Sequence, residues 1–213
     1  MSLFKSILLA SAVAFAAPAV AQAPPEYFKV VDVAADDTLN VRAGPSGSST
    51  DIGDLPHDAV GIEVAQYDAS GKWARIIWQE GDGWISARYL APDDVTQKLG
   101  PTALPSGTLC SGTEPFWSVR LASGYASYSD ITGDFHSMTI SGARVAEGRP
   151  YFPLQLGLSG DTASANVIVR LGECSDGMSD RTYPYVADFL LSAGEQGRYL
   201  SGCCTLPLEV GNQ

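Results

Sequence analysis

Residues 39–46 read Leu39-Asn40-Val41-Arg42-Ala43-Gly44-Pro45-Ser46, and this stretch decides the fold of the first half of the chain. It begins with alternating apolar and polar residues and ends in a glycine-proline pair, a pattern typical of a strand that enters a tight turn. Further short runs rich in valine, isoleucine and tryptophan follow, separated by clusters of Gly, Asp, Ser and Pro. Short strands at this spacing predict a small antiparallel barrel.

The stretch resembles the motif Leu-Asn-Val-Arg-x-Gly-Pro-Ser of bacterial SH3 domains, the SH3b modules of envelope and cell-wall proteins. The resemblance covers residues 27–91 and continues through Gly61-Ile62-Glu63-Val64, Trp73-Ala74-Arg75-Ile76 and Gly83-Trp84-Ile85. SH3b modules often target the cell wall, so the resemblance implies a ligand in the wall. Peptidoglycan or its peptide stems are the expected ligand.

The candidate contact residues of this module are Arg42, Trp73, Trp84 and Tyr89. An arginine can pair with a stem-peptide carboxylate, and aromatic rings can stack on flat amide or sugar faces. Trp73 and Trp84 are first of all expected as core residues of a small barrel, which does not exclude a ligand contact, and Arg42 fits a surface ion pair equally well. Both interpretations stay open on the sequence alone.

The first 21 residues have the pattern of a secretory signal peptide. Lys5 precedes an apolar run, and Ala19-Val20-Ala21 fits the cleavage rule for signal peptidase. No cysteine lies near that point to carry a lipid. We therefore expect a periplasmic or secreted protein with no membrane anchor after cleavage.

The sequence predicts an all-β protein made of two modules. We expect a signal peptide at 1–21, the SH3b domain at 22–91, a Pro- and Gly-containing linker at 92–108, and a C-terminal β domain at 109–213. The last of these should be a disulfide-linked antiparallel barrel or sandwich. Its strand-like segments are residues 116–121, 138–140, 165–171, 185–191 and 199–203.

All four cysteines, Cys110, Cys174, Cys203 and Cys204, lie in the second module. An exported chain meets an oxidising compartment, so two disulfides are expected. Adjacent cysteines rarely bridge each other, which leaves two pairings. Because neighbouring side chains of a strand point to opposite faces, Cys203 and Cys204 should reach different partners. We favour Cys174 with Cys203 and Cys110 with Cys204.

The second module resembles a family of uncharacterised bacterial envelope proteins. The similarity rests on residues 110–117, which include the start Glu114-Pro115-Phe116-Trp117, and on residues 174–185 and Gly202-Cys203. That family is in turn similar to the small barrels of the HslJ/META group and of membrane-bound lysozyme inhibitors. The resemblance implies a fold more than a function.

Three residues of the second module are candidate contacts. Alternation predicts that one of Phe116 and Trp117 faces inward and the other outward, and Trp117 is retained as a candidate. Asp176 and Asp180 lie on a polar loop beside Cys174, where a disulfide would hold a recognition loop rigid.

Catalysis and metal binding find little support in the sequence. His57 and His136 are isolated from each other, and the cysteines are explained as bridges, so no nucleophile and base pair is evident. No ligand spacing for zinc occurs. The pairs Asp130 with Asp134 and Asp176 with Asp180 fit loop turns better than calcium ligands. We expect no metal and no cofactor.

The formal net charge is −11, and the basic residues are scattered, which argues against a nucleic-acid partner. The sequence thus predicts an exported, non-catalytic envelope protein that binds peptidoglycan or a periplasmic protein. One alternative is a lysozyme-inhibitor-like protein, whose acidity would attract a basic hydrolase. Another is a cell-wall hydrolase anchored by the SH3b module, which would use Glu114 and an aspartate.

Overall fold

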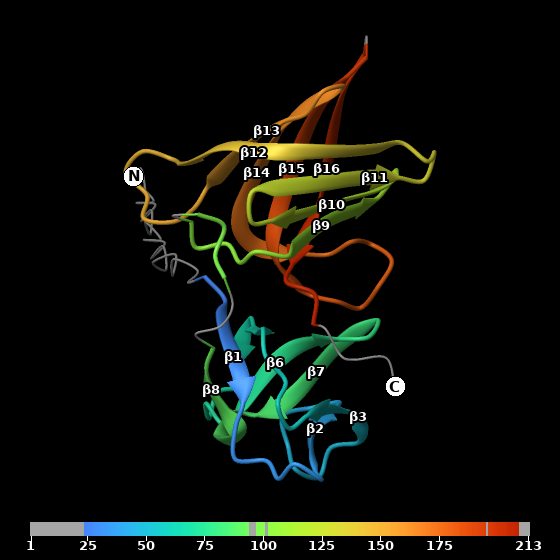
Figure 1. Ribbon diagram of the computed structural model, residues 1–213. Coiled ribbons are helices and arrows are strands. Elements are labelled where there is room, and N and C mark those ends of the chain that lie inside the picture. Colours follow the sequence, from blue (N-terminus) through green and yellow to red (C-terminus); the bar gives the residue numbers. More distant parts are fainter. Residues whose placement is uncertain (1–23, 94–96, 101, 195, 209–213) are drawn as a thin grey trace, which may run out of the picture.

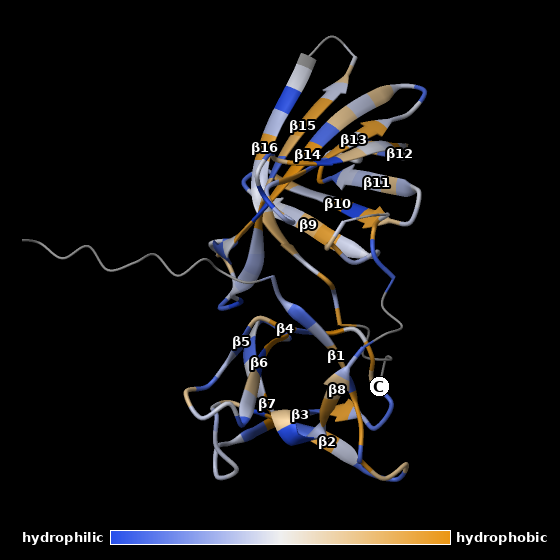
Figure 2. Ribbon diagram, turned by 90° about the vertical axis from the view of Figure 1, so that its left-hand side faces the viewer, coloured by the Kyte–Doolittle hydropathy of each residue, from blue (hydrophilic) through white to orange (hydrophobic). Residues whose placement is uncertain are grey.

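The computed structural model describes residues 24–93, 97–100, 102–194 and 196–208. Within them the chain is all-β, as predicted, and the single helical segment is the three-residue η1 (Ala87–Tyr89). Two β modules are stacked end to end (Figure 1), and the strands of the first surround a common centre (Figure 2). The predicted signal peptide lies outside the described residues.

The first module consists of two antiparallel sheets. The smaller sheet has the order β4 (Ile62–Val64), β1 (Glu26–Val30) and β8 (Leu90–Pro92). The larger has the order β3 (Asp51–Pro56), β2 (Thr38–Arg42), β7 (Gly81–Ser86), β6 (Trp73–Trp78) and β5 (Gln66–Tyr67). Alternate residues of β6 are buried, so Ala74, Ile76 and Trp78 face the core while Trp73, Arg75 and Ile77 face outward.

The second module is a closed antiparallel barrel. Its strands are β9 (Thr108–Thr113), β10 (Phe116–Ala122), β11 (Tyr125–Asp130), β12 (Phe135–Val145), β13 (Leu154–Ser159), β14 (Ala163–Cys174), β15 (Tyr183–Ala193) and β16 (Gln196–Thr205). β16 returns to pair with β9, which closes the barrel. Closure leaves no unpaired sheet edge and answers the choice between barrel and sandwich.

The interior of this barrel is filled by apolar and aromatic side chains. Trp117 and Tyr128 each stack on Phe189, with ring centroids 5.4 Å and 5.3 Å apart respectively. Large rings suit a closed barrel because each one buries a large apolar area at the shared centre. The interior of the barrel is therefore filled by side chains.

Two disulfides join the strands in the predicted pairing, Cys110 with Cys204 and Cys174 with Cys203. Cys110 of β9 lies directly opposite Cys204 of β16, so this bridge ties the two strands that close the barrel. The prediction is confirmed, and its basis, the opposite orientation of neighbouring side chains, holds at Cys203 and Cys204.

Part of the expected linker at 92–108 packs against the second barrel. Leu99 and Leu104 are buried in the barrel core, and Lys98 pairs with Pro105 in an isolated bridge. The segment was predicted as a linker because Gly and Pro residues surround its two buried leucines and hide any regular apolar pattern. Among the described residues, no helix has the length and apolar character needed to cross a membrane.

Candidate functional site

Three predicted contact residues of the first module lie on one face of its larger sheet. Arg42 on β2 and Arg75 on β6 both lie opposite Trp84 on β7, so the three side chains form a row across adjacent strands. Directly opposed residues on a sheet have Cβ atoms about 5 Å apart. We call this set the Arg–Trp–Arg row. Trp73, two residues before Arg75, faces the same side.

The row is half-buried and belongs to the outer face of the sheet. Core packing of Trp73 and Trp84, the alternative left open by the sequence, is not observed: the buried tryptophan of this module is Trp78. Trp78 donates its indole N–H to the carbonyl oxygen of Ile52 at 3.1 Å. Trp73 and Trp84 therefore keep ring surface for contacts outside the module.

Arg42 is held in place by one hydrogen bond, from Nη1 to the carbonyl oxygen of Ser49 at 2.9 Å. Its remaining N–H groups have no hydrogen-bond partner within the described chain. Arg75 instead forms ion pairs with Asp82 and with Glu173 of the second module, each at 3.4 Å. One arginine of the row is thus open to a ligand and the other is tied to the second barrel.

The other predicted contact residues do not join this face. Tyr89 packs against the core of the first module, and the Arg88 guanidinium lies 5.3 Å from the centre of its ring. Trp117 is 4% exposed and stacks on Phe189, so its assignment as a contact residue was wrong. The reason is the strand register: Phe116, 45% exposed, is the outward member of the pair.

Asp176 organises the loop between β14 and β15. Its Oδ1 accepts the N–H groups of Met178 and Ser179, and its Oδ2 accepts the hydroxyls of Ser179 and Tyr183, all within 2.9 Å. Partial burial acts to raise the pKa of Asp176, but these hydrogen bonds outweigh it and hold the pKa at about 2. Both carboxylate oxygens are thus occupied by hydrogen bonds, so Asp176 is not free to act as a catalytic acid.

The same loop docks on the hairpin between β6 and β7. The N–H of Asp180 donates to the carbonyl oxygen of Glu80 at 2.9 Å, and the N–H of Thr182 donates to Oδ1 of Asp82 at 3.1 Å. Arg181 donates to the carbonyl of Gln79 and, at 3.0 Å, to the Glu80 carboxylate. The predicted recognition loop is therefore an interface element between the modules, a role that only the folded arrangement reveals.

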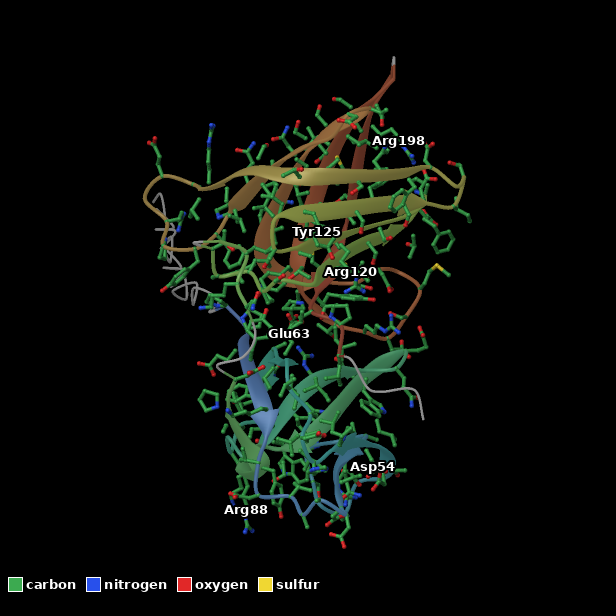
Figure 3. All side chains as sticks on the ribbon, in the orientation of Figure 1. Asp54, Glu63, Arg88, Arg120, Tyr125 and Arg198 are labelled. Atoms are coloured by element: carbon green, nitrogen blue, oxygen red, sulfur yellow. A yellow bond between two sulfur atoms is a disulfide. The ribbon has the colours of Figure 1, made fainter. Side chains whose placement is uncertain are left out.

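A second group of contacts between the modules centres on Glu63, labelled at the boundary in Figure 3. This β4 residue accepts hydrogen bonds from Thr205 Oγ1, from the N–H of Leu206 at 3.2 Å and from Tyr27 Oη at 2.9 Å. Tyr27 also shares a hydrogen bond with Tyr185 of the second barrel at 2.9 Å. Burial raises the pKa of Glu63 to about 7, although these hydrogen bonds act in the opposite direction.

A cleft of about 620 Å³ lies between the modules. Trp78, Glu63 and Ile62 line it from the first module, and Ser111, Arg181 and Leu206 from the second. Leu208, just beyond β16, packs against the core of the first module and so bridges the two. The sequence does not predict this cleft, because its walls come from segments far apart in the chain.

Two of the aspartates considered as calcium ligands, Asp130 and Asp176, accept hydrogen bonds from neighbouring protein groups instead. Asp130 accepts hydrogen bonds from Thr132 and Arg198, which hold its pKa well below the ordinary range, as expected for a loop turn. No cluster of three or more His, Cys, Asp or Glu residues suited to a metal occurs in the described part of the chain. His136 stacks on Tyr128, with ring centroids 6.0 Å apart.

Comparisons with protein-family models, with curated proteins and with solved structures found no match for this chain. The fold and the site define it by class: an all-β protein of two docked modules, the second a disulfide-bridged closed barrel, with an aromatic and cationic row on the first.

Proposed function

We propose that the chain is an exported, non-catalytic binding protein whose first module binds peptidoglycan through the Arg–Trp–Arg row. The observation that supports this most directly is the row itself, in which an outward tryptophan lies between two arginines on one face. Aromatic and arginine side chains provide most of the binding energy at typical recognition surfaces.

The chemistry of the row suits a peptide-bearing polysaccharide. Trp84 and Trp73 offer flat apolar faces for sugar rings or amide planes. The unpaired N–H groups of Arg42 suit a carboxylate of a peptide stem, because the guanidinium fork matches the two carboxylate oxygens. In a chain with a net charge of −11, such an arginine also offers local attraction to an anionic polymer.

The second module supports this role mechanically. It holds Arg75 through Glu173 and the β6–β7 hairpin through Arg181, so docking fixes one end of the row. Rigid side chains lose less entropy when they bind a ligand.

Co-sedimentation of the purified protein with peptidoglycan sacculi tests the proposal. Trp84→Ala and Arg42→Ala should each weaken binding about fivefold or more, because truncation of such anchors commonly costs over about 1 kcal/mol. Arg120→Ala is the matched control, since Arg120 also donates one Nη1 hydrogen bond to a backbone carbonyl, that of Gly107. Its pelleting should equal that of the wild type.

Two results would contradict the proposal: a wild-type protein that stays in the supernatant, or all three variants pelleting alike. Thermal unfolding of each variant separates lost binding from lost folding. Arg42→Lys provides a further check, because it keeps the charge but removes the fork, and it should bind more weakly than the wild type.

A further inference from the structure

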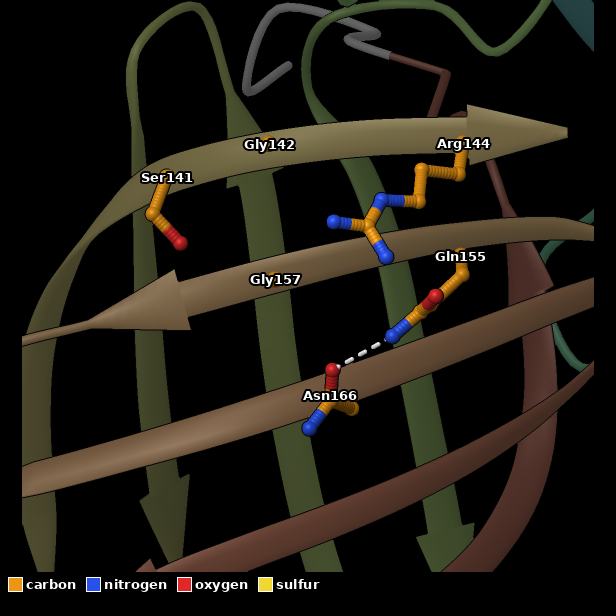
Figure 4. A pocket seen from close by; sticks show the side chains of 6 residues that line it. All are labelled: Ser141, Gly142, Arg144, Gln155, Gly157 and Asn166. Atoms are coloured by element: carbon orange, nitrogen blue, oxygen red, sulfur yellow. Dashed lines mark hydrogen bonds between the residues drawn. The ribbon is translucent and has the colours of Figure 1, made fainter.

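A polar hollow of about 250 Å³ lies on the outer face of the second barrel, over β12, β13 and β14 (Figure 4). Its lining residues are Ser141, Gly142, Arg144, Gln155, Gly157 and Asn166. It is separate from the Arg–Trp–Arg row, which belongs to the first module. The proposed wall binding does not involve it.

Two glycines form the floor of the hollow. Gly142 lies directly opposite Gly157, which in turn lies opposite Asn166 on the next strand. The register shifts between Ile140 and Gly142, so Ser141 is the extra residue of a β-bulge. A Cβ added to Gly142 would meet no atom within 4 Å, because it would project into open space. Bulges of this kind re-aim side chains and are common beside binding sites.

Hydrogen-bond donors surround this floor. Figure 4 shows the Arg144 guanidinium and the Ser141 hydroxyl extending over Gly157 from opposite sides. Among the described residues, the Arg144 side chain has no hydrogen-bond or ion-pair partner, and the residue opposite it is the neutral Gln155. Gln155 Nε2 donates to Asn166 Oδ1 at 2.7 Å, which fixes Asn166 with this oxygen toward the floor and its Nδ2 group turned away from Gly157 (Figure 4).

The charge balance of the hollow favours a monoanion. One guanidinium supplies a single positive charge, and the amide and hydroxyl donors are neutral. A chain with a net charge of −11 repels a dianion more strongly than a monoanion. The planar fork of arginine matches a carboxylate in particular. The volume lies below the range for drug-sized ligands and suits a small group such as the end of a peptide.

We propose that this hollow binds the terminal carboxylate of a peptide. Arg144 pairs with the carboxylate oxygens, Ser141 Oγ supplies a further donor, and the Oε1 atom of Gln155 accepts the N–H of the terminal peptide bond. The glycine floor lets the ligand approach the sheet closely. Two sources share this chemistry, the D-alanine end of a wall peptide and the L-residue end of a protein.

Titration of the full protein with N-acetyl-alanyl-alanine, followed by backbone amide NMR, tests the site. The L,L and D,D forms distinguish the two sources, and either one binding supports the site. We expect shifts at Gly142, Gly157 and Asn166 with the free acid and at least about tenfold weaker binding of the C-terminal amide, because a hydrogen bond to a charged group is lost. Arg144→Ala should weaken binding of the acid by a similar factor.

Arg149→Ala is the control, because it removes the same charge from the exposed β12–β13 connection outside the hollow. It should bind the acid as the wild type does. Absence of shifts with both stereoisomers would overturn the proposal, as would equal binding of acid and amide, or unchanged binding by Arg144→Ala. The titration of Arg42→Ala should match the wild type, so the result stands apart from the proposed wall binding.

Discussion

Gly202 lies on β16 where its backbone packs closely against β9 and the Trp117 ring. A Cβ added there would lie 2.0 Å from the carbonyl oxygen of Ser111 and 3.0 Å from the Trp117 ring. Because the first neighbour is backbone, β9 or β16 must shift to make room. We predict that Gly202→Ala lowers the free energy of unfolding by about 1–3 kcal/mol, the usual cost of overpacking, measured by denaturant unfolding.

Gly197 on the same strand provides the comparison. Its added Cβ would lie 3.6 Å from the carbonyl oxygen of Leu191, an ordinary contact. Gly197→Ala should therefore change the unfolding free energy by less than about 0.5 kcal/mol. Equal stability of the two variants would show that the β9–β16 approach is looser than described.

The sequence predicted that neighbouring residues on a strand face opposite sides, but it did not predict which of the two faces inward. Alternation correctly placed one of Phe116 and Trp117 inside, but it did not say which, and Trp117 proved to be the buried one. In the first module, Trp73, Trp78 and Trp84 look alike in sequence. Only the strand phase of β6 and β7 separates the buried Trp78 from the two outward rings.

Among the strands, β9 and β16 close the second barrel, and a disulfide joins them. It joins residues 94 apart in sequence, whereas the bridge between β14 and β16 joins residues 29 apart. In the chain-entropy model, the longer loop gives about 4–5 kcal/mol and the shorter about 3–4 kcal/mol. We predict that Cys110→Ala with Cys204→Ala destabilises the second barrel more than Cys174→Ala with Cys203→Ala, measured by urea unfolding.

The first module provides the internal reference for this comparison. It contains no cysteine, so reduction should leave its unfolding transition almost in place while the transition of the second barrel moves to lower urea. A reversed order of the two double variants would mean that native packing around each pair outweighs loop entropy.

Five strands of the second module were predicted, and three others, β9, β11 and β13, were missed. The five segments expected in the second module all lie within strands, from β10 to β16. β11 was missed because its sequence, Tyr-Ala-Ser-Tyr-Ser-Asp, is mostly small and polar, with Ala126 and Tyr128 as its buried residues. β13 was also missed, although Leu154, Leu156 and Leu158 alternate and are all buried; its alternating pattern was an available signal.

The docking of the two modules belongs to the whole molecule, and sequence patterns could not predict it. Glu63 was recognised only as part of a strand, yet it meets Thr205 and Leu206, more than 140 positions away. The loop at Asp176–Asp180 was interpreted as a recognition element because it is polar and lies beside a cysteine. Its polar groups instead form hydrogen bonds with the β6–β7 hairpin. This contact depends on how the two modules are placed relative to each other, which the sequence pattern does not show.

Glu63 makes this docking sensitive to pH. Its pKa is about 7 in the folded protein against 4.5 for an ordinary glutamate, so the folded state binds more protons between these values. The stabilisation is therefore fully present below about pH 4.5 and is lost as pH rises through 7. The shift corresponds to roughly 3 kcal/mol at most, since one pKa unit equals about 1.4 kcal/mol. We predict that the unfolding free energy of the first module falls between pH 5 and pH 8, measured by tryptophan fluorescence in denaturant.

Glu63→Gln isolates this contribution, because glutamine is uncharged throughout the range and still offers one oxygen acceptor. Its pH slope between 5 and 8 should be nearly flat. Glu173→Gln is the control, because Glu173 also contacts the other module but is 67% exposed, so the slope should persist. The tyrosines facing Glu63 remain neutral in this window, since burial raises the pKa of both Tyr27 and Tyr185. A slope that survives in Glu63→Gln would assign the pH dependence to other groups and leave Glu63 a purely structural acceptor between the modules.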